Sequence, residues 1–197
     1  SYYSYVLDEL TDEAKLWQRM AKSQRRRISR GEESYVVRDD MGMDVLLPLV
    51  KETFGRRGLT FDDDPIMAER VLNAAADRES GRILIAVDKR GKAVAGAFFV
   101  WDAASTFYLL GGRTDDVEDD NAMPLVLWEG IRRAAGVSQQ FDFEGSMIEG
   151  VEAFFRRFGG HPVPYSHLER LSPLADAARH GRQYLGSARQ LFARASN

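Results

Sequence analysis

The sequence contains no cysteine, and this absence excludes several kinds of chemistry at once. Disulfide bonds, thiol nucleophiles and cysteine-ligated zinc are ruled out, and the composition fits a cytoplasmic location. The three histidines, His161, His167 and His180, lack the H-E-x-x-H spacing of a zinc-binding helix, so we expect no metal site. No signal-peptide pattern leads the chain, and no apolar run approaches the ~20 residues that a membrane-spanning helix needs.

A large excess of one charge is also lacking, but the charges are unevenly distributed. The 27 basic and 30 acidic side chains leave a net charge of −3 on 197 residues. Seven basic and no acidic residues lie within 15–30, whereas five acidic residues lie within 115–120. These two clusters are therefore more informative about partners than the overall charge.

Periodicity, turns and caps divide the chain into a leading strand and basic helix in 1–31, a central α/β domain in 32–172, and an amphipathic tail helix in 173–197. Strands are expected within 1–10, 35–38, 83–87, 93–101, 106–111, 139–144 and 167–171. Helices are expected at 12–30, 45–54, 65–80, 122–135 and 147–158, with Thr11, Asp44, Asp64, Asn121 and Ser146 as their N-caps.

The strand at 139–144 and the helix after it are the stretch around which the chain is organised. Alternation places Phe141 and Phe143 on one face of the strand and Asp142 and Glu144 on the other. Gly145 then breaks the extended run. Because ligands of α/β proteins bind beyond strand ends and against helix N-termini, we expect the functional site here.

The two carboxylates are the leading catalytic candidates. Asp142 or Glu144 could accept a proton from an attacking amine, or bind a substrate ammonium group. The alternative is that they pair with arginines or face solvent. Ser146, with Glu149 three residues later, forms a capping box and is most simply a cap, although it also lies where a substrate would bind.

Two arginines in the following helix have different predicted roles. Arg156 lies four residues after Glu152, which favours a surface ion pair, with substrate contact as the alternative. Arg157 shares a helix face with the small residues Gly150 and Ala153, so we expect it to contact an anion near the reacting groups.

A basic stripe occupies the leading helix, formed by Arg19, Lys22, Arg26 and Arg30 at helical spacing. It is either a solvated face or a contact for the phosphates of tRNA or of a nucleotide-linked substrate; nothing in the sequence favours DNA. Tyr108 and Tyr165 lie near strand ends, and each is either a substrate-binding hydroxyl or a packed aromatic.

The sequence F-D-F-E-G-S at 141–146, followed by a helix that ends in F-F-R-R-F-G-G at 154–160, resembles the second half of Fem-type aminoacyltransferases and related double-GNAT acyltransferases. The resemblance extends over 34–172. It implies a GNAT-like α/β fold, a mixed twisted sheet flanked by helices, in which an acyl donor lies between two splayed parallel strands. It also implies transfer of an acyl group to a small amine or peptide acceptor, forming an amide.

The donor is suggested by a loop that departs from the common pattern. GNAT enzymes that use acyl-CoA usually hold its pyrophosphate with an [RQ]-x-x-G-x-[GA] loop, and the matching segment 113–121 reads R-T-D-D-V-E-D-D-N. It lacks the glycines, and its carboxylates would repel pyrophosphate, although Arg113 could contact substrate. The resemblance therefore favours aminoacyl-tRNA as co-substrate, with acyl-CoA as the alternative and no tightly bound cofactor.

Two further departures bear on function. Fem-type relatives often have F-K-x-x-F-G in this helix, with the lysine near the transferred group, and Phe155 occupies the lysine position here. The chain also covers about one GNAT half. We therefore expect a missing first half or a homodimer, and a non-catalytic half that binds a partner or peptide is the alternative to an enzyme.

Overall fold

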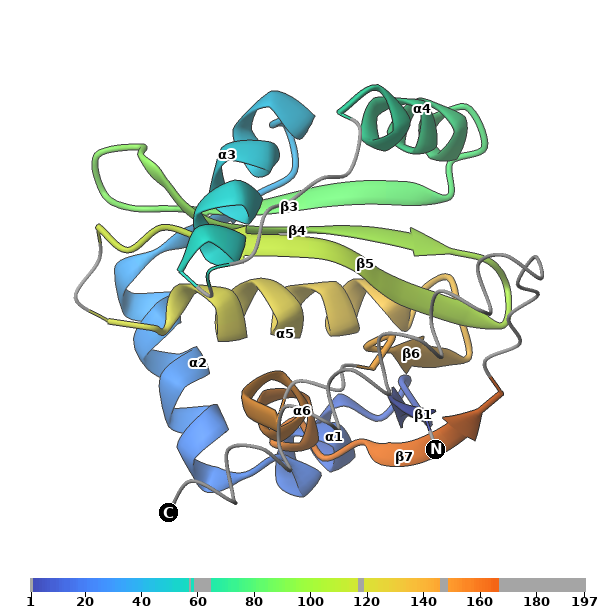
Figure 1. The fold of residues 1–197 in the computed structure, drawn as a ribbon. Helices are drawn as coiled ribbons and strands as arrows, with labels where there is room; N and C mark the ends of the chain where they lie inside the picture. The colour runs from blue at the N-terminus through green and yellow to red at the C-terminus, as the bar shows by residue number, and fades with distance from the viewer. Residues whose placement is uncertain (1, 57, 59–64, 117–118, 146–148, 167–197) are drawn as a thin grey trace, which may run out of the picture. The chain divides into compact units, whose positions relative to one another are not determined.

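The computed structural model describes residues 2–56, 58, 65–116, 119–145 and 149–166. A compact unit spans Ser1–Tyr165 (Figure 1). Its described helices are α1 (Glu13–Arg19), α2 (Lys22–Ser34), α3 (Met43–Gly55), α4 (Pro65–Ala76), α5 (Ala122–Ala134) and α6 (Glu149–Arg156). Its strands are β1 (Tyr2–Leu7), β2 (Val36–Arg38), β3 (Gly81–Val87), β4 (Ala93–Trp101), β5 (Ser105–Arg113), β6 (Gln140–Asp142) and β7 (His161–Tyr165).

The strands form one mixed sheet in the order β2-β3-β4-β5-β6-β1-β7. All neighbouring strands are antiparallel except β5 and β6, which are parallel. β3, β4 and β5 form a meander, in which short turns join adjacent antiparallel strands. The prediction of a mixed α/β sheet flanked by helices is confirmed.

Helices cover both faces of this sheet. In Figure 1, α3 and α4 lie above β3 and β4, and α2 and α5 lie below. The two cores follow from alternation: Leu84 and Ala86 of β3 pack in the core with α5, whereas Ile83 and Ile85 pack in the core with α3. A central strand buried on both faces reads as a continuous apolar run, as β3 does.

A glycine pair allows α3 to lie directly on the sheet. Gly96 of β4 and Gly112 of β5 are ladder partners. A Cβ on Gly112 would collide with the backbone of Leu49, and one on Gly96 would collide with Ile85 and approach Leu46 of α3. Gly96 therefore marks a close approach between helix and sheet, as a glycine within a strand often does.

The predicted leading helix is two helices, α1 and α2, because the chain becomes extended at Met20. Met20 is buried in the core, and the backbone nitrogen of Ala21 donates to the carbonyl of Arg157 at 2.9 Å. These tertiary contacts interrupt a segment whose local sequence favours a continuous helix. The cap also differs: Asp12, rather than Thr11, accepts a hydrogen bond from the backbone of Lys15.

The N-caps of other helices also differ from the prediction. Asp44 lies within the first turn of α3, with Gly42 at the N-cap, and the side chain of Asn121 makes no capping bond to α5. The proposed cap residues Asp64 and Ser146 lie outside the described residues.

The last described strand was not predicted. β7 spans His161–Tyr165 and contains Pro162 and Pro164. Edge strands tolerate proline, since an outward-facing N–H has no ladder partner. Residues 167–171 and the predicted tail helix at 173–197 lie outside the described residues. The leading segment 1–31 contributes β1 to the same sheet, between β6 and β7.

Candidate active site

A cleft opens where β5 and β6 separate. The two parallel strands are paired from Ser105 opposite Gln140 to Phe107 opposite Asp142. β6 then ends, while β5 continues to Arg113. The predicted splay between parallel strands is therefore present.

A β-bulge lies at the start of the splay. Phe98 of β4 pairs with Leu110, and Phe99 pairs with Tyr108, so Leu109 is the extra residue of β5. The side chain of Leu109 is exposed. The bulge leaves Leu109 outside the β4–β5 ladder. On the other side of β5, the pairing with β6 has ended at Phe107, so backbone groups there have no partner in β6.

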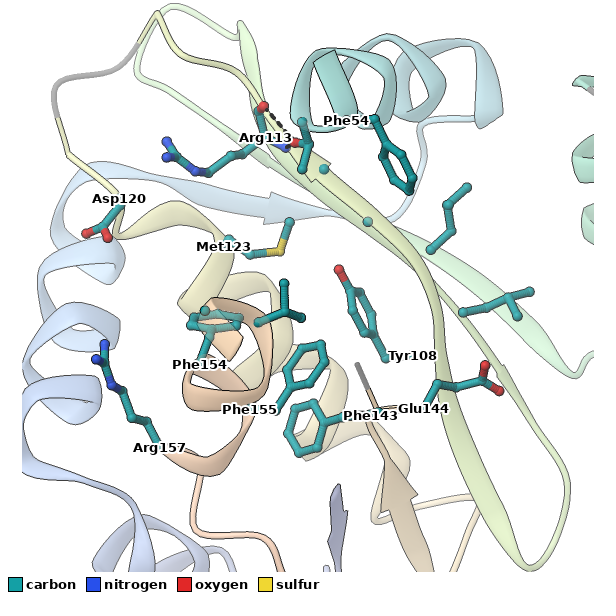
Figure 2. Close-up of a pocket in the computed structure, with 18 of the residues that line it drawn as sticks. Phe54, Tyr108, Arg113, Asp120, Met123, Phe143, Glu144, Phe154, Phe155 and Arg157 are labelled. Atoms are coloured by element: carbon teal, nitrogen blue, oxygen red, sulfur yellow. Dashed lines mark hydrogen bonds between the residues drawn. The ribbon is translucent and has the colours of Figure 1, made fainter. Parts of the chain in front are cut away.

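The splay leads into a pocket of about 660 Å³. Figure 2 shows Arg113, Asp120 and Arg157 on one side, Glu144 across the pocket, and aromatic side chains between them. The lining residues come from α2, α3, β5, α5, α6 and the turn after β6; they are Arg27, Thr53, Phe54, Arg56, Tyr108, Leu109, Leu110, Gly111, Gly112, Arg113, Asp120, Met123, Phe143, Glu144, Gly145, Gly150, Val151, Phe154, Phe155 and Arg157.

Aromatic rings form the floor of the pocket. Phe143 stacks on Phe155 with centroids 5.0 Å apart, and Tyr108 meets the same ring edge-on at 5.8 Å. Phe155, the position of the family lysine, is buried in this cluster. The structure therefore has an apolar ring where the resemblance implies an ammonium group.

Glu144 and Asp120 are the carboxylates that line the pocket, and they lie on opposite sides of it. Partial burial of the Glu144 carboxyl group, and then the nearby charge of Asp142, raise its pKa above the usual value. The prediction that Asp142 and Glu144 share a strand face was wrong: β6 ends at Asp142, and Glu144 has a positive φ of 61°. The backbone turns at this residue, so its side chain leaves the strand's alternation.

Asp142 is not among the pocket-lining residues. Its Oδ1 accepts hydrogen bonds from the hydroxyl of Ser4 and, at 2.7 Å, from the backbone nitrogen of Glu144. Asp142 thus connects β1 to the turn that presents Glu144. Gly145 follows with a φ of 69°, and a Cβ there would collide with the carbonyl oxygen of Tyr3.

Three arginines lie at the other side of the pocket. Arg113 and Arg157 were predicted to contact substrate; Arg27, from α2, was not. Arg27 pairs with Asp120, donates to its carbonyl at 2.6 Å, and lies 5.7 Å from the Phe154 ring centroid. Burial lowers the pKa of Arg27, and the charges of Arg157 and Arg113 lower it further.

The sequence alone does not single out Arg27, because the polar Gln24 that marks its side of α2 gives no apolar signal. Buried Gln24 and Ile28 define the inward face of α2, and Arg27 lies three residues after Gln24. The predicted stripe instead followed the opposite face, where Lys22, Arg26 and Arg30 are exposed.

Three described carboxylates of the acidic segment before α5, those of Asp115, Asp116 and Asp120, are paired with cations. Asp115 pairs with Arg56, and Asp116 pairs with Lys92 at 2.6 Å. Asp119 accepts from the hydroxyl of Tyr35 at 3.0 Å. The expected repulsion of an anion by this loop is therefore weaker than its sequence implies, although its lack of glycine is unchanged.

The other predicted site residues that the structure describes do not line the pocket. Arg156 is 3.9 Å from Glu152, which confirms the expected ion pair. Arg19, on α1, is 3.6 Å from Glu9. Tyr165 is exposed on the edge strand β7, and Ser146 lies outside the described residues.

A family model described as "Acetyltransferase (GNAT) domain" matches residues 16–156 of this sequence. The chain belongs to this GNAT family. A search of curated proteins with this sequence finds no match. In the described part of the chain, no helix is long and apolar enough to cross a membrane.

Solved structures share the fold of this GNAT domain. FemX superposes with a TM-score of 0.73 at 13% identity, covering 81% of this chain and 59% of FemX. A conserved protein from Bacteroides thetaiotaomicron gives 0.56 at 17% identity, covering 81% of this chain and 56% of its own. The C-terminal domain of a putative lysylphosphatidylglycerol synthetase from Agrobacterium fabrum gives 0.52 at 15% identity, covering 82% and 57%.

The likeness to these structures establishes the fold alone, since the identities are low. The chain spans a little over half the length of each of these three proteins. These structures therefore assign no catalytic residue to this chain.

Proposed function

We propose that this GNAT domain transfers an acyl group to a primary amine and forms an amide, with aminoacyl-tRNA as the favoured donor. The observation that supports it best is the pocket at the β5–β6 splay, which places the carboxylate of Glu144 across from a cluster of arginines. The acceptor amine binds near Glu144, and the anionic part of the donor binds near the arginines.

The reaction needs a proton acceptor and stabilisation of an oxyanion. The amine nitrogen attacks the carbonyl carbon of the donor ester, and the carboxylate of Glu144 takes the amine proton. The resulting oxyanion accepts hydrogen bonds from backbone N–H groups of the bulged segment at Tyr108–Leu110. The carbon–oxygen bond to the donor then breaks as the amide forms, and the departing oxygen takes the proton from Glu144.

The raised pKa of Glu144 suits this role, because a more basic carboxylate accepts a proton more readily. Asp142 is proposed as a positioning residue, since it holds the backbone of Glu144 and contributes charge beside it. Arg157 and Arg113 contact the donor, and Tyr108 lines the wall between the two substrates.

Two features favour aminoacyl-tRNA over acyl-CoA. The loop 113–121 has no glycine with which to surround pyrophosphate. The α2 helix, which brings Arg27 to the pocket, also exposes Lys22, Arg26 and Arg30, a surface suited to a polyanion. The observation that favours acyl-CoA is that Asp115, Asp116 and Asp120 are paired with cations.

The chain covers only 56–59% of the length of these structural neighbours, and this bears on the function. We propose that a second GNAT half, or a second copy of this chain, completes the acceptor site. Sedimentation or light scattering would test the second copy: a strict monomer that is fully active would contradict that part of the proposal.

The deciding experiment offers purified protein aminoacyl-tRNA or acetyl-CoA with a panel of amines and small peptides, and detects amide products by mass spectrometry. We expect product from the tRNA donor, and a drop of about 100-fold or more in kcat for Glu144→Gln. Glu69→Gln, an exposed substitution on α4, is the matched control. Product from neither donor would favour a non-catalytic half that binds a partner or peptide, as Phe155 in the lysine position suggests.

A further inference from the structure

Arg27, Arg113 and Arg157 come from separate parts of the chain and line one side of the same pocket. Arg113 and Arg157 both act electrostatically on Arg27, and the three side chains line the same pocket. In Figure 2, the ends of Arg113 and Arg157 extend to the side where Asp120 lies. Like charges repel, so an anion bound among these side chains would be favourably held.

Carboxylates of the protein neutralise only part of this positive charge. Asp120 pairs with Arg27. Among the described residues, no salt bridge joins a carboxylate to Arg113 or Arg157, which leaves two positive charges uncompensated. The Nε of Arg27 is also buried without an acceptor among these residues. Arg56 lines the pocket too, but Asp115 and Thr53 already engage its guanidinium.

We propose that Arg27, Arg113 and Arg157 form a phosphate subsite for the acyl donor, an inference that rests on the proposed acyl transfer. Guanidinium groups bind phosphate through paired N–H donors, and several can share its oxygens. Here the arginines take the place of the glycine-rich backbone loop that is missing from 113–121. Two uncompensated charges match a phosphate better than a carboxylate, which carries one charge and is satisfied by one bidentate arginine.

The backbone around the subsite is braced independently of any ligand. The hydroxyl of Thr53 accepts from the nitrogen of Arg113 at 2.8 Å and donates to its carbonyl at 3.1 Å. The carbonyl of Arg157 accepts from the nitrogen of Ala21 at 2.9 Å. Because these contacts involve the backbone, shortening an arginine side chain removes charge from the pocket without removing its framework.

Phosphate chemistry could come from the phosphodiester groups near the 3′ end of a tRNA or from the phosphates of CoA, and competition separates the two sources. Calorimetry first measures binding of inorganic phosphate to the whole chain, with acetate as the carboxylate probe. A short RNA acceptor stem and CoA are then each tested for displacement of phosphate. We expect the RNA to compete and acetate to bind at least about tenfold more weakly than phosphate.

Substitutions assign the binding to these residues. Arg113→Gln and Arg157→Gln should each weaken phosphate binding by about tenfold, the scale of one charge-assisted hydrogen bond. Arg90→Gln, in the exposed β3–β4 turn, removes the same charge far from the pocket and should leave binding unchanged. Arg157→Lys should restore part of the affinity, since it keeps the charge. Circular dichroism and thermal melting verify that each variant is folded.

Several outcomes would overturn the subsite. Absence of phosphate binding, equal binding of acetate, or an equal loss in Arg90→Gln would each contradict it. Phosphate binding that neither RNA nor CoA displaces would contradict its assignment to the donor. Acyl transfer unaffected by Arg113→Gln and Arg157→Gln would support the proposed function and contradict the phosphate subsite. Phosphate binding at these arginines without any acyl transfer would support an anion site and contradict the proposed function.

Discussion

Asp142 and Glu144 are joined through the backbone: the nitrogen of Glu144 donates to the carboxylate of Asp142 at 2.7 Å. Glu144 adopts a left-handed conformation that costs a residue with a side chain about 1–2 kcal/mol. The hydrogen bond offsets part of that cost and turns the Glu144 side chain into the pocket. The two carboxylates therefore have different roles, one holding the turn and the other facing the reaction.

Replacing Asp142 should affect activity through Glu144. Asp142→Ala removes the acceptor, so we expect kcat to fall about tenfold or more with little change in the KM for the donor. Asp142→Asn retains an acceptor oxygen but removes the charge, so the pKa of Glu144 should fall and the pH profile should shift to lower pH. Steady-state kinetics across pH would measure both effects. A rise in KM alone would show that Asp142 binds substrate directly.

The pH dependence should report the ionisation of Glu144. Its pKa is raised in the folded protein, first by burial of the carboxyl group and then by Asp142, so activity should rise with pH through a value above that of an ordinary glutamate. Glu144→Gln should abolish this limb of the profile. A profile that keeps its acidic limb in the variant would assign the proton acceptor to another group.

The same shift has a consequence for stability. The folded state favours protonated Glu144, so this group supports folding fully below its unfolded pKa and loses that contribution as pH rises through the folded pKa. Glu144→Gln should therefore raise Tm relative to the parent at pH 7 and change it less at pH 4. Thermal melts at both values provide the comparison, and the opposite ordering would contradict the raised pKa.

Gly145 should tolerate no side chain. Gly145→Ala would place a methyl group against the carbonyl oxygen of Tyr3 at a φ of 69°, and we expect a loss of about 2 kcal/mol or more in the free energy of unfolding. Gly150→Ala is the control, since its added methyl meets open space in α6 and should stabilise the protein by up to ~1 kcal/mol. Urea unfolding would measure both, and equal effects would mean that the turn is less constrained than its geometry implies.

Phe155 should be needed for packing even if it has no chemical role. It is buried between Phe143 and Tyr108, so Phe155→Lys leaves a void and buries an ammonium group. We expect a loss of about 3–5 kcal/mol, close to that of Phe155→Ala, and a smaller loss for Phe155→Leu. A stable, more active Phe155→Lys would instead show that the pocket accommodates the family lysine.

Local sequence was sufficient for much of the fold. The apolar runs of β3 and β4, the short turns between them and the strong periodicity of α5 each carry their own signal, because period and turn chemistry are properties of neighbouring residues. The break between α1 and α2 and the place of β7 had no such signal. They depend on contacts such as Ala21 with Arg157, and β7 with β1, which join residues far apart in the chain.

The candidate site also has features that local sequence predicts and features that depend on tertiary contacts. Local sequence predicts that a strand, a glycine and a helix meet near Asp142 and Glu144, since the residues that terminate a strand and permit a turn are adjacent in the chain. Three features depend on the folded chain: Glu144 rather than Asp142 faces the pocket, Arg27 joins Arg113 and Arg157, and three aspartates before α5 pair with cations. Those outcomes depend on the directions of side chains from several elements, and such directions are set by packing rather than by local pattern.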